Sequence, residues 1–120
     1  MPKVFTSPSQ RTGEFGERIA VRFLDKHGYS VIEQNYTKPC GEIDIIARKG
    51  QVLFFIEVKA KTGRARANIS KEGEYRPEDG MHPSKISRLR KTIAAYLKER
   101  AYFGEWQFGL ITMYLNNATR

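Results

Sequence analysis

The chain has 120 residues, 40% of them hydrophobic and 12% aromatic, which is enough for one domain with its own core and excludes a disordered composition. Its formal charge of +8 favours a polyanion such as nucleic acid as partner, although the same charge could serve solubility alone. One cysteine, no apolar signal segment and no run near the roughly 20 apolar residues of a membrane helix predict a cytoplasmic protein without membrane association.

An amphipathic helix is predicted after a flexible N-terminus of residues 1–11. It begins with Thr12 as N-cap and runs to His27, with Gly28 as the stop. Its expected apolar face consists of Phe15, Ile19, Ala20, Phe23 and Leu24. Glu17 lies on the flank of this face, where a carboxylate is costly unless a partner or a cation meets it.

Three strands are predicted next, over residues 29–36, 42–48 and 52–59, and the third has the strongest β pattern. The short link Lys49-Gly50-Gln51 predicts an antiparallel hairpin between the second and third strands. Residues 62–83 carry several Gly and Pro and no apolar periodicity, so we expect a flexible basic loop. Such a loop is either functional or a tolerated insertion.

A second helix is predicted from Ser84 as N-cap to about Phe103, ended by Gly104, and a final strand from Trp106 to Leu115. The inward residues of this second helix should be Ile86, Leu89, Ile93, Tyr96 and Leu97. In the final strand, we expect Trp106 to lie in the core. The order α-β-β-β-α-β predicts a single α/β domain over residues 1–120. Its mixed sheet should have about four strands flanked by helices.

Acidic residues stand in strands that otherwise read as buried. Alternation along the third strand places Leu53, Phe55, Glu57 and Lys59 on one side and Phe54, Ile56 and Val58 on the other. The hairpin should bring Asp44 close to Glu57, and two neighbouring carboxylates must protonate or meet a cation. Mg²⁺ is held by few carboxylates plus water and phosphate oxygens, and Lys59 could orient the attacking water. The alternative is a structural salt bridge among Asp44, Glu57 and Lys59.

Three motifs carry a family resemblance. Gly13-x-x-Gly16-Glu17-x-x-Ala20, Gly41-Glu42-Ile43-Asp44 and Phe55-Ile56-Glu57-Val58-Lys59 resemble motifs of the YraN family of uncharacterised bacterial proteins, and the likeness spans about residues 12–115. That family is similar to the restriction-endonuclease-like PD-(D/E)xK superfamily, and especially to archaeal Holliday-junction resolvases. The resemblance therefore implies a restriction-endonuclease-like fold.

The same resemblance implies roles for individual residues. Asp44 and Glu57 would be metal ligands, with the carbonyl of Val58 as a third oxygen. Lys59 would be the catalytic lysine, and Glu17 the helical acid that completes the site. Glu42 would have a supporting role. The chain departs from the family where Gln107-Phe108-Gly109-Leu110-Ile111 replaces an Asp-bearing stretch and where residue 61 is Lys rather than Arg.

Basic residues follow the third strand. Between Ala60 and Arg100 there are eleven Lys or Arg and five Asp or Glu, so 11 − 5 = +6 of the net charge falls in this segment. The candidates for contact with nucleic acid are Lys61, Arg64, Arg66, Lys85, Arg88 and Lys91. A solvated helix face is the alternative for these residues, and His82 is expected to be an exposed loop residue.

The leading expectation is a Mg²⁺- or Mn²⁺-dependent endonuclease that hydrolyses phosphodiester bonds in DNA, with structure-specific cutting in repair or recombination as its finer form. A non-catalytic nucleic-acid-binding accessory protein on the same fold is the main alternative, and a protein-interaction module is a weaker one. Cutting two strands would need two sites, so a homodimer is left open beside a monomer.

Overall fold

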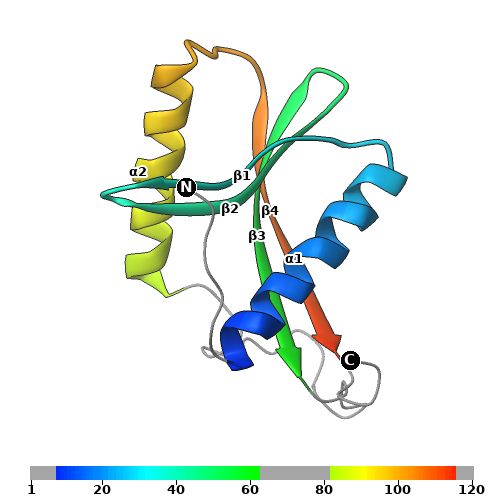
Figure 1. The fold of residues 1–120 in the computed structure, drawn as a ribbon. Coiled ribbons are helices and arrows are strands. Elements are labelled where there is room, and N and C mark those ends of the chain that lie inside the picture. The colour runs from blue at the N-terminus through cyan, green and yellow to red at the C-terminus, as the bar shows by residue number, and fades with distance from the viewer. Residues whose placement is uncertain (1–7, 63–81, 116–120) are drawn as a thin grey trace, which may run out of the picture.

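The computed structural model describes residues 8–62 and 82–115 of the chain (Figure 1). The elements are α1 (Pro8–Lys26), β1 (Ser30–Lys38), β2 (Gly41–Lys49), β3 (Val52–Thr62), α2 (Pro83–Glu99) and β4 (Trp106–Leu115). This is the predicted α-β-β-β-α-β order. Most of the loop expected at 62–83, and the first seven residues of the expected flexible N-terminus, lie outside the described residues.

The four strands form one mixed sheet in the order β1-β2-β3-β4. β1 pairs antiparallel with β2, and β2 forms the predicted antiparallel hairpin with β3 around Gly50, whose φ is +62°. β4 lies parallel to β3 at the sheet edge, because α2 provides the crossover that a parallel connection needs. The α/β class and the mixed four-stranded sheet are therefore confirmed.

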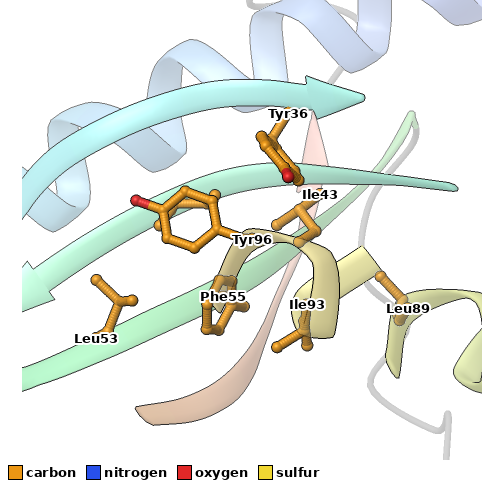
Figure 2. Packing of buried hydrophobic residues seen from close by; sticks show 8 residues of the cluster. Tyr36, Ile43, Leu53, Phe55, Leu89, Ile93 and Tyr96 are labelled. Atoms are coloured by element: carbon orange, nitrogen blue, oxygen red, sulfur yellow. The ribbon is translucent and has the colours of Figure 1, made fainter. Parts of the chain in front are cut away.

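Each helix covers its own face of the sheet and builds a separate core. Leu89, Ile93 and Tyr96 of α2 pack with Leu53 and Phe55 of β3 in one core, which Figure 2 shows together with Tyr36 and Ile43. The other core joins α1 to the sheet and contains Ala20, Leu24, Ile45, Ala47 and Ile56. The predicted alternation along β3 is confirmed, since its odd-numbered residues face α2 and its even-numbered residues face α1.

α1 differs from the prediction at its start and on its buried face. It begins at Pro8, so Thr12 lies inside the helix and is not its N-cap. Of the expected apolar face, Ala20 and Leu24 are buried, whereas Phe15 and Phe23 are 37% and 50% exposed. The small residue Gly16 lets the helix approach β3 closely at Ala60.

This close approach predicts opposite effects for two glycines of α1. A Cβ on Gly16 would lie 2.5 Å from the Ala60 Cβ, whereas one on Gly13 would meet nothing within 4 Å. We expect Gly16→Ala to lower the free energy of unfolding by about 1–2 kcal/mol through overpacking. Gly13→Ala, the matched control, should raise it by up to about 1 kcal/mol through helix propensity. Urea unfolding curves measure both, and equal stabilisation by the two changes would contradict the packing described.

α2 starts and ends earlier than predicted. Its N-cap is His82 rather than Ser84: the His82 ring nitrogen accepts a hydrogen bond from the Ser84 N–H at 3.1 Å. Pro83 lacks an N–H and fits the first turn, so the residue before it becomes the cap. At the other end Ala101 takes a left-handed φ of +50°, and the Tyr102 N–H reaches the Leu97 carbonyl at 3.0 Å. This Schellman-type end stops the helix at Glu99, before Gly104 is reached.

The C-terminal end of α2 is tied to β1 by polar contacts. The Tyr36 hydroxyl donates to Glu99 at 2.7 Å, Lys38 forms an ion pair with the same carboxylate, and Arg100 pairs with Glu33 at 2.9 Å. Hydrogen bonds from Lys38 and then Tyr36 lower the pKa of Glu99. These contacts join the C-terminal end of α2 to β1 beside the core that Leu89, Ile93 and Tyr96 form.

β4 begins and ends where predicted, but Trp106 is 41% exposed, so its placement in the core was wrong. The strand lies at the sheet edge, beyond the part that α2 covers. Within residues 8–62 and 82–115, neither helix has the length and apolar character needed to cross a membrane.

Candidate functional site

A cavity of about 170 Å³ opens where β2 and β3 meet the N-terminal half of α2. It is lined by Gly41, Glu42, Asp44, Glu57, Lys85, Arg88 and Leu89. Two of the predicted metal ligands, Asp44 and Glu57, therefore share one cavity, as the hairpin geometry predicted. Lys85 and Arg88, two of the predicted nucleic-acid contacts, form its basic side.

Asp44 is held by a backbone group of the neighbouring strand. The paired register of β2 and β3 ends at Ile45 and Ile56. Just beyond it, the Val58 N–H donates to the Asp44 Oδ2 at 2.8 Å. A main-chain N–H next to a buried side chain needs an acceptor, and the carboxylate provides it where the ladder ends. Asp44 is only 9% exposed, so this contact fixes the direction of its carboxylate.

Glu57 is paired with a lysine from α2. The Lys85 Nζ lies 2.7 Å from the Glu57 Oε2, and the side chains of Lys85 and Glu57 are 39% and 12% exposed. The ammonium compensates a carboxylate that the sheet and α2 shield from water. Sequence reasoning assigned Lys85 to nucleic acid and missed this ion pair. The two residues are far apart in the chain, and only the crossing of α2 over the sheet brings them together.

The turn between β1 and β2 allows α2 to come close to the cavity. A Cβ on Gly41, where φ is +157°, would lie 2.8 Å from the Thr92 Oγ1, so a side chain there would push the helix away. The preceding Cys40 is half-buried with its Sγ 3.5 Å from the same hydroxyl. Cys40 is therefore a packed turn residue. Glu42, expected to have a supporting role, lies on the cavity wall itself.

Glu17 and Lys59 do not line this cavity. Glu17 directly follows Gly16, the residue through which α1 contacts Ala60. This contact lies on the face of the sheet opposite to α2. Lys59 lies two residues beyond Glu57 on β3. In the described part of the chain, no three His, Cys, Asp or Glu side chains gather closely enough to hold one metal ion. The structure thus brings Asp44 and Glu57 together and leaves Glu17 outside that pair.

The predicted basic surface is described only in part. Lys85 and Arg88 line the cavity, Lys91 is exposed on α2, and Lys61 is half-buried near the end of β3. Arg64 and Arg66 lie outside the described residues.

The donor set of the cavity fits a hard divalent cation. Asp44 and Glu57 offer carboxylate oxygens, and Mg²⁺ is commonly bound by one or two carboxylates, with water and substrate phosphate as its other ligands. A third protein carboxylate is not required for such a site. The contact observed for Val58 uses its N–H rather than its carbonyl, so its predicted role as an oxygen ligand stays a prediction.

Comparisons with known proteins place the chain in a family. The model of the uncharacterised protein family UPF0102 matches residues 16–113. A UPF0102 protein of Flavobacterium psychrophilum is 36% identical over 102 residues, which cover 85% of this chain and 79% of that protein. A UPF0102 protein of Moorella thermoacetica is 32% identical over 116 residues, covering 96% and 90% respectively. A third, from Campylobacter hominis, is 39% identical over 95 residues, covering 79% and 76%.

Proposed function

Given that this chain belongs to the UPF0102 family, the YraN-like family that its motifs predicted, we propose that it is a Mg²⁺-dependent endonuclease that hydrolyses phosphodiester bonds in DNA. The observation that carries the proposal is the shared cavity of Asp44 and Glu57, with Lys85 and Arg88 on its basic side. This hydrolysis requires carboxylates that bind a metal ion and cationic side chains that bind the phosphate.

Asp44 and Glu57 would hold the ion. When bound there, Mg²⁺ supplies charge stabilisation at the phosphoryl oxygens and lowers the pKa of a coordinated water. The Val58 N–H keeps the Asp44 carboxylate directed into the cavity. The family resemblance implies that Lys59 is the catalytic lysine and that Glu17 is the helical acid that completes the site, although neither residue lines the cavity.

Lys85 has two states in this proposal. Without substrate its ammonium neutralises Glu57 across 2.7 Å. With Glu57 as a metal ligand, the Lys85 ammonium would be available to the incoming phosphate, with Arg88 beside it on the same wall of the cavity. The basic wall therefore pairs with Glu57 in the resting protein and would position the DNA backbone in the complex. Contacts of this kind carry little sequence information, so we expect selection by DNA structure.

Two further assignments accompany the proposal. Symmetric cutting of a branched substrate needs two active sites, so branched-DNA cleavage entails a homodimer, whereas a monomer would cut single strands.

The lone cysteine, which allows no internal disulfide, is consistent with a cytosolic protein.

The test is cleavage of labelled branched, nicked and single-stranded DNA by wild type and Glu57→Gln. We expect cleavage that requires Mg²⁺ or Mn²⁺, stops with a chelator, and falls on the order of a thousandfold in the variant, because one metal ligand is lost. Glutamine keeps the size of the side chain and removes only its charge. Equal residual cleavage by the two proteins would contradict the proposal.

A second candidate is a nucleic-acid-binding accessory protein without turnover. The observation that favours it is the Glu57–Lys85 ion pair, since a carboxylate already neutralised by lysine can have a purely structural role. This candidate predicts DNA affinity that falls steeply with salt and is unchanged in Glu57→Gln. It also predicts that calorimetric titration with Mn²⁺ gives no binding heat, whereas the nuclease proposal predicts heat that disappears in Asp44→Ala.

A further inference from the structure

β4 presents an uncovered row of apolar side chains on the face of the sheet that carries α2. Its register with β3 places Trp106 beside Leu53, Phe108 beside Phe55 and Leu110 beside Glu57. Trp106 and Phe108 are each 41% exposed, and Leu110 is 42% exposed. Large exposed apolar patches are uncommon on protein surfaces and usually mark a binding site.

Trp106 and Phe108 of this row form one wall of a groove. A cavity of about 270 Å³ between β4 and α2 is lined by Ile86, Leu89, Arg90, Ile93, Trp106 and Phe108; we call it the stacking groove. The Trp106 ring lies edge-on to the buried Phe55 ring, with centroids 5.6 Å apart and an interplanar angle of 83°. The indole is thus supported from the core side while part of it stays accessible in the groove.

Charge indicates what kind of molecule fits the groove. Arg90 is the charged residue among its lining residues, and Leu89 lines both this groove and the acidic cavity, where Lys85 and Arg88 lie. An aromatic wall with Arg90 beside it, and with Lys85 and Arg88 in the neighbouring cavity, suits a planar, apolar group attached to an anion. A nucleobase on its phosphate backbone has this chemistry.

The position of the groove relates it to the proposed metal site. Phe108 lies beside Phe55, which precedes Glu57 by two residues on the same face of β3. Two residues of strand span roughly 6.6 Å, so the aromatic wall of the stacking groove ends next to the acidic cavity. A strand with a base in the groove would therefore present its backbone to Asp44 and Glu57.

We propose that the stacking groove binds an unpaired nucleobase on Trp106 and Phe108, which makes DNA with single-stranded segments the substrate class. This rests on the proposed nuclease function and narrows it. Bases within an intact duplex are already stacked and paired, and extracting one costs energy. Single-stranded tails, flaps and the open centres of branched molecules offer bases without that cost.

Trp106 is the sole tryptophan of the chain, so its fluorescence reports directly on the groove. We propose titrating the protein, with chelator and without metal, with a dT oligonucleotide and with a blunt duplex of equal length. The oligonucleotide should quench the emission and the duplex should not. Phe108→Leu should weaken binding of the oligonucleotide about tenfold, because leucine keeps apolar volume but loses the ring face. Phe108→Tyr should restore it.

Phe103 provides the matched control. It is 94% exposed and outside the groove, so Phe103→Leu should bind like wild type. Equal affinity of wild type and Phe108→Leu would overturn the proposal. A second result would also overturn the proposal: without DNA, the Trp106 emission shifts as the protein concentration rises, and sedimentation shows a doubled mass. A second copy of the chain would then occupy the groove.

The two proposals can fail separately. Quenching that depends on Phe108, without any cleavage that depends on Glu57, would support the groove and refute the nuclease. Cleavage that depends on Glu57 but acts equally on blunt duplex and single strands, with no loss in Phe108→Leu, would support the nuclease and refute the groove.

Discussion

Asp44→Asn is expected to reduce metal-dependent DNA cleavage on the order of a thousandfold while the protein stays folded. Asparagine removes the charge that a divalent ion needs but keeps an oxygen that can accept the Val58 N–H, the contact seen at 2.8 Å. The change therefore separates the electrostatic role of the carboxylate from its structural role. Cleavage rates with Mg²⁺ and urea unfolding curves, measured on the same preparations, give both quantities.

Asp44→Ala is the comparison that makes this separation measurable. It removes the charge and the acceptor together, so the Val58 N–H loses its partner beside a residue that is 9% exposed. We expect the same loss of cleavage, and in addition a decrease of about 1–3 kcal/mol in the free energy of unfolding. Should Asp44→Asn cleave at the wild-type rate, Asp44 would have a structural role only.

Lys85→Met is expected to move two quantities in opposite directions. DNA cleavage should fall about a hundredfold, because the variant lacks a cation for the phosphate. Affinity for Mn²⁺ measured without DNA should rise about fivefold, because the ion no longer competes with the ammonium for Glu57. The second effect is modest because Lys85 is 39% exposed, and water screens such a pair. Calorimetry and cleavage kinetics provide the two measurements.

Two other lysines complete this experiment. Lys98 is exposed in the last turn of α2, far along the helix from Lys85, so Lys98→Met should leave both quantities unchanged. Lys59→Met should lower cleavage, because the family resemblance makes Lys59 the catalytic lysine. If Lys85→Met bound Mn²⁺ with the same affinity as wild type, the Glu57–Lys85 ion pair would not compete with the metal in solution. A gain in Lys59→Met instead would identify Lys59 as the competing cation.

Local patterns in the sequence were sufficient for most of the architecture. The alternation along β3 and the short Gly50 turn depend on neighbouring residues, and both were predicted correctly. The apolar spacing of α2 was predicted correctly for Leu89, Ile93 and Tyr96, but Ile86, expected to face inward, is 38% exposed. The partnership of Asp44 and Glu57 followed from the same logic, because a hairpin with a short turn aligns its strands. Its chemical role remains a prediction.

The predictions that were wrong depend on competition between several local signals. α2 could end at Gly104, but the left-handed turn at Ala101 and the packing of Tyr102 against the α2 core ended it earlier. Trp106 carries the apolar character of a core residue, yet it lies beyond the cover of α2 and becomes part of a groove. Neither outcome can be read from residue type, because each depends on what lies opposite.

By itself, the sequence determined the order of elements, the faces of the strands and two acidic residues directed to one place, since these properties follow from periodicity and short turns. Only the tertiary structure decided that Lys85 meets Glu57, that Gly16 brings α1 onto Ala60 with Glu17 outside the acidic cavity, and that β4 keeps its aromatic residues exposed. The physical reason is that these contacts join segments distant in the chain. Their geometry depends on how closely each helix packs against the sheet, which is a property of the whole core.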